Sequence, residues 1–172
     1  MNLQIIKYFI LFVVMILLQV LLCNRIFLFD CAIPIICFYF IVRLPMNLNL
    51  NWTLTFAFLL GFIVDVFSDI PGVNSLACTI LAVLKRPVYF LYVPKDDKTK
   101  EETPTLRTLG PTTYCKYLLT LTALYCLMVF SFDFFSISEI DNILKMSIGS
   151  TILSFPILLC IDSIVPVDSI HR

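Results

Sequence analysis

The sequence predicts an all-α integral membrane protein: a compact bundle of about six transmembrane helices in a single polytopic domain, residues 1–172. Of its 172 residues 60% are hydrophobic and only 14% are charged. The mean hydropathy of +0.97 lies far above that of a soluble domain. Twelve basic and twelve acidic residues cancel. The surroundings that this composition favours are therefore a lipid bilayer, and no net charge attracts nucleic acid.

Six apolar segments approach the length of about 17–25 residues that a membrane-spanning helix needs. They are residues 3–23, 30–44, 52–68, 73–92, 113–132 and 143–165. The first could be an export signal, because Lys7 precedes an apolar run. That run is long for a signal core and no small-x-small cleavage site follows it, so we expect a permanent helix.

The second segment is the least regular. It is short, begins beside Pro34 and ends at Arg43 and Pro45. Because proline interrupts helices, this segment either spans, lies half-buried against its neighbours, or extends into the preceding residues. The third and fourth segments are separated by Pro71-Gly72, a strong chain-breaking pair.

The one long polar connection, residues 93–112, contains three prolines and charges of both signs, which predicts a solvated loop. Lys and Arg in short connections favour the cytoplasmic side of a membrane. Their distribution here predicts a cytoplasmic loop 93–112 and places both the N-terminus and the C-terminus in the cytoplasm.

Residues for enzymatic chemistry are scarce. The single histidine, His171, is penultimate, and the seven cysteines are scattered without a CxxC pair. No glycine-rich phosphate loop, GxSxG or HExxH motif occurs. We therefore expect no enzyme activity, no metal site and no cofactor.

The stretch GFIVDVFSDIPG places Gly61, Asp65 and Asp69 on one face of the third helix. A carboxylate inside a span costs at least about 2.5–3.5 kcal/mol near the bilayer centre, so Asp65 needs a reason. At 1.5 Å per residue it lies only about 6 Å below Asp69. Asp65 then either bonds to a neighbouring helix or partner that Gly61 lets approach, the interpretation we favour, or reaches headgroup water. Asp69 is predicted to be a solvated helix end.

Three further charged residues lie near the predicted cytoplasmic boundary. Lys85 and Arg86 interrupt the fourth helix, and Arg86 lies about 21 Å along the helix from Gly72. This depth predicts interfacial anchors and rules out an ion pair between Arg86 and Asp65. Asp162 is predicted to be within reach of interfacial water.

The order of these motifs resembles that of the bacterial rod shape-determining protein MreD family. The third helix ends in GxxxDxxS closely followed by PG, and the fourth ends in a basic residue before proline, within LKRPVYFLYVPKDD. In this resemblance Gly61, Asp65, Gly72 and Arg86 match recurring positions of the family, and Asp69 lies within the same stretch.

The resemblance implies a non-enzymatic component of the cell-elongation (rod) complex in the bacterial cytoplasmic (inner) membrane, supporting cell shape and peptidoglycan synthesis. Its implied partners are MreC and, with it, MreB, RodA and a penicillin-binding transpeptidase. The family is also similar in architecture to the substrate-binding subunits of vitamin importers. The alternative is therefore a small-molecule binding subunit of a transporter, with a pocket near Asp65, Asp69, Asn74 and Ser75.

Overall fold

The computed structural model describes residues 2–21, 34–93, 103–134 and 140–164, and the regular elements in these ranges are all α-helices. In chain order they are α1 (Asn2–Leu21), α2 (Tyr39–Arg43), α3 (Leu50–Ser68), α4 (Val73–Tyr92), α5 (Leu106–Leu109), α6 (Pro111–Phe134) and α7 (Ile140–Ile164). The predicted all-α class is thus confirmed for the described part of the chain.

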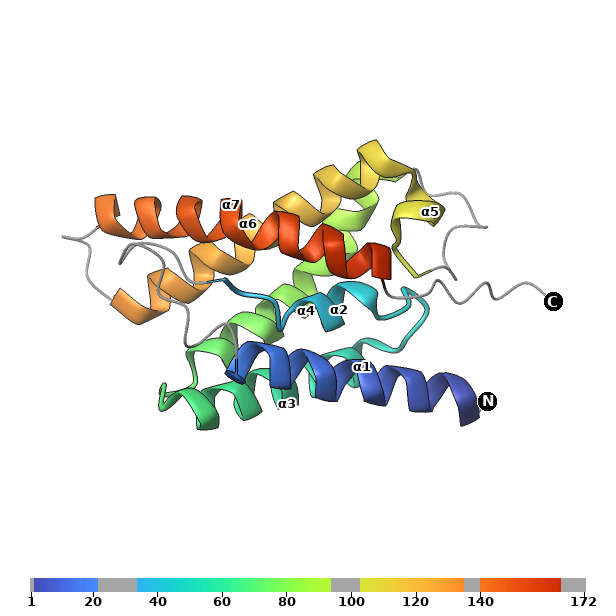
Figure 1. Ribbon diagram of the computed structural model, residues 1–172, viewed down its shortest axis with the longest axis horizontal. Coiled ribbons are helices and arrows are strands. Elements are labelled where there is room, and N and C mark those ends of the chain that lie inside the picture. Colours follow the sequence, from blue (N-terminus) through green and yellow to red (C-terminus); the bar gives the residue numbers. More distant parts are fainter. Residues whose placement is uncertain (1, 22–33, 94–102, 135–139, 165–172) are drawn as a thin grey trace.

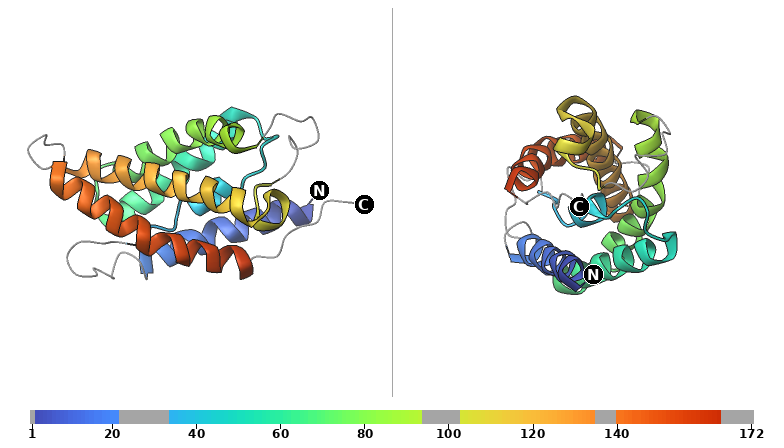
Figure 2. Two further views of the ribbon diagram at one scale, coloured as in Figure 1. Left: turned by 90° about the horizontal axis from the view of Figure 1, so that it is seen from above. Right: turned by 90° about the vertical axis from the view of Figure 1, so that its right-hand side faces the viewer.

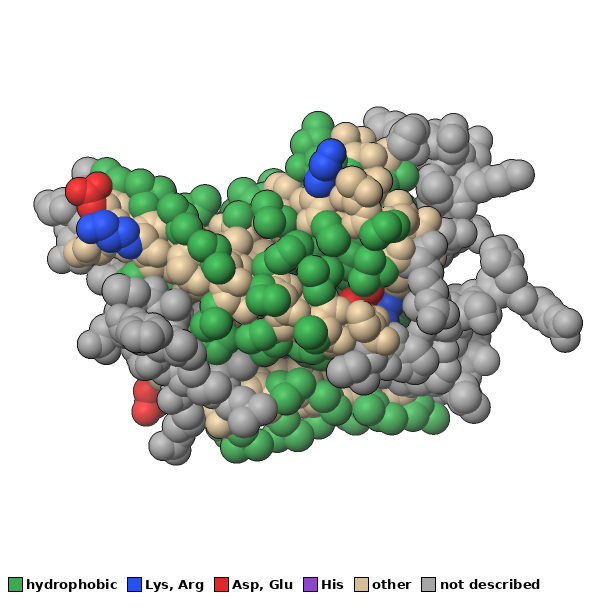
Figure 3. Space-filling model, turned by 45° about the horizontal axis from the view of Figure 1, so that its top comes forward, with side chains coloured by type: hydrophobic (Ala, Val, Ile, Leu, Met, Phe, Trp, Pro, Cys, Tyr) green, Lys and Arg blue, Asp and Glu red, His purple; other side chains and the backbone are tan. Residues whose placement is uncertain are grey.

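Four of these helices, α3, α4, α6 and α7, are long and apolar enough to cross a membrane. They coincide with the predicted spans 52–68, 73–92, 113–132 and 143–165. α1 begins near the predicted residue 3, and its residues Tyr8–Leu21 form a predominantly apolar helix that is shorter than these four. On the face drawn in Figure 3, hydrophobic side chains cover the middle of the bundle, and charged side chains lie mostly toward its ends. These helices mark the chain as a membrane protein.

The interpretation of residues 30–44 as a spanning helix is wrong. Residues 30–33 lie outside the described part, Pro34 to Cys37 are not in a regular helix, and α2 has only five residues. Every residue from 34 to 44 is buried. A short, partly non-helical segment is compatible with a membrane bundle because protein, rather than lipid, surrounds its backbone.

The five long helices form an arc around this buried segment. The neighbours along the arc are α1–α3–α4–α6–α7, and α2 contacts α1, α3 and α4. Seen end-on, α2 lies in the middle of the bundle (Figures 1 and 2). The beginning of α1 and the end of α7 lie at the same end of the bundle (Figure 1). The assignment of that end to the cytoplasm stays a prediction.

Side chains of the outermost helices of the arc satisfy the non-helical backbone. The Ile35 N–H donates to Ser154 Oγ of α7 at 2.8 Å. Gln19 Oε1 of α1 accepts from the N–H groups of the next two residues at 2.7 and 3.2 Å, and its Nε2 donates to the Pro34 carbonyl at 3.4 Å. Gln19 and Ser154 are both buried, so these bonds replace water that cannot reach the segment.

The second half of the predicted solvated loop 93–112 is folded, whereas residues 94–102 lie outside the described part. Thr105 caps α5: its side chain accepts from the Thr108 N–H, and the Thr108 hydroxyl accepts in return from the Thr105 N–H. Thr105 is fully buried and α5 packs on α6. This part of the loop therefore packs on the bundle through Pro104 and Thr105, while Thr108, Pro111 and Thr112 are exposed.

We predict that Gln19→Leu destabilises the protein by about 2 kcal/mol or more, because each buried N–H left without an acceptor costs about 1–3 kcal/mol. Thermal unfolding of the purified protein in detergent measures the effect. Leu17→Ala, two residues earlier on the exposed face of α1, is the control and should change stability little. Equal effects of the two substitutions would contradict the role assigned to Gln19.

Candidate functional site

The turn between α3 and α4 holds most of the predicted site residues. α3 ends at Ser68, and the next residue, Asp69, adopts the left-handed conformation with φ 54° and ψ 33°. Gly72 is also left-handed, with φ 75°, and directly precedes α4. The N–H groups of Asp69 and Ile70 both bond to the Asp65 carbonyl, which closes the last turn of α3. Two left-handed residues within four positions make this reversal tight.

Asp65 caps the neighbouring helix. One carboxylate oxygen accepts from the backbone N–H and the side-chain Nδ2 of Asn74, each at 3.0 Å, and the other accepts from the Ser75 N–H at 2.7 Å. The residue at the α4 N-cap is Gly72, which has no side chain that could accept these bonds. Asp65 supplies the missing acceptor from α3, and its negative charge faces the positive end of the α4 dipole.

Through its side chain, Asp65 contacts α4 of its own chain. Its side chain is only 3% exposed, so it does not reach headgroup water. The hydrogen bonds that it accepts from described residues come from Asn74 and Ser75 of α4. We call Gly61, Asp65, Gly72, Asn74 and Ser75 the hairpin cluster, because together they join α3 to α4.

Gly61 brings the two helix backbones into contact one turn before Asp65. A Cβ atom at this position would lie 2.4 Å from the Ser75 Cα and 2.6 Å from both the Asn74 carbonyl oxygen and the Ser75 nitrogen. These are backbone atoms and cannot turn away as a side chain can. Glycine is therefore what allows Asp65 to reach the first turn of α4.

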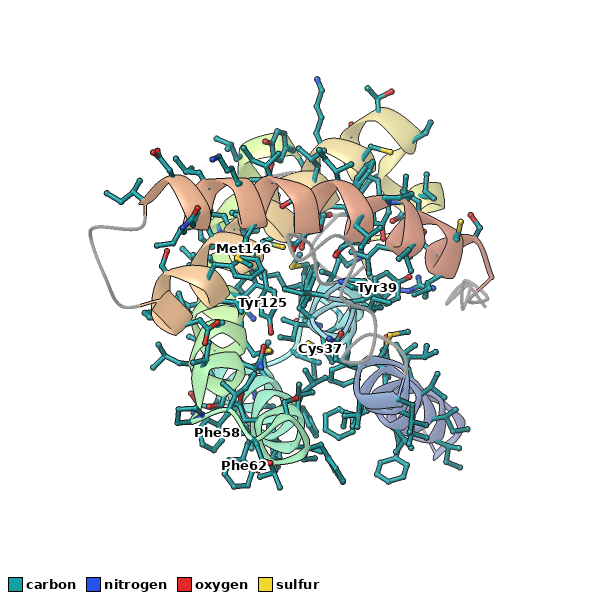
Figure 4. All side chains as sticks on the ribbon, turned by 60° about the vertical axis from the view of Figure 1, so that its left-hand side comes forward. Cys37, Tyr39, Phe58, Phe62, Tyr125 and Met146 are labelled. Atoms are coloured by element: carbon teal, nitrogen blue, oxygen red, sulfur yellow. The ribbon has the colours of Figure 1, made fainter. Side chains whose placement is uncertain are left out.

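The hairpin cluster continues into the centre of the bundle. The Tyr125 hydroxyl of α6 donates to Asn74 Oδ1 at 3.1 Å and lies 3.5 Å from the free thiols of Cys37 and Cys78. The Tyr125 ring stacks on Phe38 at a centroid distance of 4.8 Å. Tyr125 and Cys37 both point into the interior (Figure 4). The hydrogen bond between Tyr125 and Asn74 was not predicted from the sequence. The sequence feature that could have indicated it is the presence of these two polar side chains within apolar helices.

Asp69 is exposed, as the sequence predicts for a helix end. It lies at a shallow depression of about 500 Å³ beside the turn, lined by Phe62, Asp65, Val66, Asp69, Ile70, Pro71 and Gly72. Apolar side chains and the turn form most of the wall. The carboxylate of Asp65 is already occupied by α4, so Asp69 is the acidic group of the depression that stays accessible.

Lys85 and Arg86 bind backbone carbonyls that follow α2. Lys85 Nζ donates to the Leu44 carbonyl, and Arg86 Nη2 donates to the carbonyls of Met46 and Leu48. Arg86 is half-buried and is not paired with Asp65, as predicted. Lys85 is only 1% exposed, so its interpretation as an interfacial anchor is wrong. Both side chains hold the chain where it leaves the buried segment.

A second polar cluster surrounds Asp162 of α7. One carboxylate oxygen accepts from the hydroxyls of Tyr39 at 2.6 Å and Tyr114 at 2.9 Å, and the other accepts from the Leu106 N–H at 3.3 Å. Arg43 Nε lies 3.7 Å from the first oxygen. The prediction that water reaches Asp162 is wrong, because the residue is only 4% exposed.

These contacts indicate what the two carboxylates do. Asp65 and Asp162 each accept at least three hydrogen bonds from the protein. Both carboxylates therefore join neighbouring helices. Among the described residues, no group of three or more His, Cys, Asp or Glu side chains could hold a metal ion. The observed contacts of both acids are those of a structural frame.

We predict that Asp65→Asn destabilises the protein by about 1–2 kcal/mol, because it replaces a charged acceptor oxygen at a helix N-terminus with an amide nitrogen. Asp69→Asn is a closely matched control: it lies four residues later, is exposed and tolerates the left-handed backbone. Its unfolding free energy should stay within about 0.5 kcal/mol of wild type. Thermal unfolding in detergent distinguishes the two, and equal shifts would contradict the capping role.

Gly61→Ala is expected to cost about 1–3 kcal/mol or more, since the new methyl group overlaps the α4 backbone and forces the two helices apart. Leu59→Ala on the exposed face of α3 serves as the surface control. Unfolding in detergent and the loss of crosslinking between cysteines placed across α3 and α4 measure the change. A Gly61→Ala protein as stable as wild type would show that the close contact is not needed.

Three comparisons with known proteins complete the description of the site. No family model matches the sequence, and no match to a curated protein or to a solved structure is found.

Proposed function

We propose that the chain is a non-enzymatic component of the bacterial cell-elongation complex, of the MreD kind, which binds the single membrane-spanning helix of MreC in the inner membrane. In this role it supports cell shape and peptidoglycan synthesis. MreC would connect it to MreB, RodA and a penicillin-binding transpeptidase.

One observation supports the proposal most: the motif residues that suggest the resemblance occupy positions in the fold where few other residue types would fit. Gly61, Asp65 and Gly72 form the α3–α4 hairpin, and Arg86 holds the chain that leaves the buried segment. Such positions restrict the residue type strongly, which is what makes a short motif recur. The resemblance thus involves residues on which the architecture depends.

The engagement of the buried charges also supports an interaction role. Asp65 and Asp162 are bonded to backbone and side-chain donors, and Lys85 and Arg86 are bonded to carbonyls. A protein whose work is to present a surface needs a stable frame of this kind. The alternative, a transporter subunit with a small-molecule site, has less support, because Asp65, Asn74 and Ser75 bond to one another.

The lipid-exposed surface offers room for a partner helix. Large apolar side chains are exposed along α1, α3 and α7, where a second helix can replace lipid. Because lipid and helix are equally apolar, such a contact depends on fitted packing and on polar groups at its ends.

The proposal predicts that the full-length chain, tagged and extracted in a mild detergent, retains MreC from the bacterium that encodes it, whereas a similarly tagged unrelated membrane protein does not. Depletion of the chain should convert rod-shaped cells to round ones within a few generations, and a wild-type copy should restore the rods. Cells that stay rod-shaped and a preparation without MreC would together overturn the proposal.

A further inference from the structure

Asp69 has an unusual position for a residue with a side chain. Left-handed positions that follow a helix are usually glycine, because other L-residues pay a conformational cost there. Asp69 is the described non-glycine residue with positive φ. Its carboxylate is exposed and has no hydrogen bond or ion pair within the described part of the chain. The Asp65 carbonyl accepts the N–H groups that close the turn, so the Asp69 side chain is not needed for capping and has no partner among the described residues.

An exposed aromatic stripe leads along α3 toward this carboxylate. Phe58, Phe62 and Val66 follow one another at intervals of four residues and are 51%, 50% and 60% exposed. The rings of Phe58 and Phe62 are stacked with centroids 6.1 Å apart, and both point away from the bundle (Figure 4). The stripe is about 12 Å long, and Phe62 and Val66 also line the depression at Asp69.

We infer that this stripe and the depression form the docking surface for a single transmembrane helix of a partner protein, apolar along the stripe and carrying a Lys or Arg at the end that faces Asp69. The inference rests on the proposed function, under which the partner is MreC. The depression receives a side chain of the partner helix, and Asp69 binds the cation at its edge. We call Phe58, Phe62, Val66 and Asp69 the α3 docking surface.

Charge complementarity favours a protein helix with a terminal cation as the occupant. An exposed acid beside an apolar stripe is complementary in charge to a helix whose apolar residues are followed by a Lys or Arg. Stacked aromatic rings present a fixed shape, which favours a fitted helix over mobile lipid chains. The stripe Ile140, Leu144, Ile148 and Ile152 on α7 is also exposed at intervals of four residues, but its side chains are aliphatic, and it provides an internal control.

The test uses the full chain co-expressed with MreC and carrying the photocrosslinker p-benzoylphenylalanine at Val66 or, as control, at Ile148, which is 57% exposed. Illumination in cells should give an adduct with the MreC transmembrane helix from Val66 at least several times stronger than from Ile148. Equal adducts from both positions, or only lipid adducts from Val66 while MreC still co-purifies, would overturn the docking surface and leave the proposed function standing. Failure of MreC to co-purify would overturn both.

A charge exchange tests the Asp69 contact itself. Asp69→Asn keeps a residue that tolerates the left-handed backbone and should reduce MreC recovery roughly fivefold, the effect of one favourable ion pair worth about 1 kcal/mol. Asp69→Lys should reduce it further, and replacement of the facing Lys or Arg of MreC by Asp should restore recovery in that variant. Unchanged recovery with Asp69→Lys, in a protein of normal stability, would show that the carboxylate does not contact the partner.

Discussion

The structure depends on the hydrogen bonding of a backbone segment that is not helical yet is buried in the centre of a membrane bundle. Neither water nor lipid can bond to its N–H and C=O groups, so side chains must. Gln19 and Ser154 serve its first residues, and Lys85 and Arg86 serve the carbonyls after α2. Because these side chains come from α1, α4 and α7, the central segment also joins helices that are distant in the arc.

The two buried acids complete this frame. Asp65 joins α3 to α4, and Asn74 extends that junction to α6 through Tyr125. Asp162 joins α7 to α2, α5 and α6. A buried carboxylate is costly unless donors surround it, and each of these accepts at least three hydrogen bonds. The charges therefore determine which helices meet, while apolar packing supplies most of the attraction.

The residues that stabilise the fold and the residues exposed on the outer surface are different sets. The polar groups that specify the fold face inward, and the large apolar side chains of α1, α3 and α7 face outward. The exposed acid at the α3–α4 turn stands apart from both groups, since it is not used by the hairpin that it belongs to. The proposed scaffold role requires such a separation, because a partner helix must contact the outer surface without disturbing the inner hydrogen bonds.

Length and apolar composition were sufficient to predict α3, α4, α6 and α7, and spacing by four residues was sufficient to put Gly61 and Asp65 on one face. The same approach was wrong about residues 30–44, Lys85 and Asp162. Counting along one helix gives a residue's depth, but it cannot say what lies across from it. Whether a charged side chain is solvated or hydrogen-bonded depends on residues that can be far away in the sequence. Tyr39, for example, donates a hydrogen bond to Asp162 although the two are 123 residues apart. Only the tertiary structure brings such partners together.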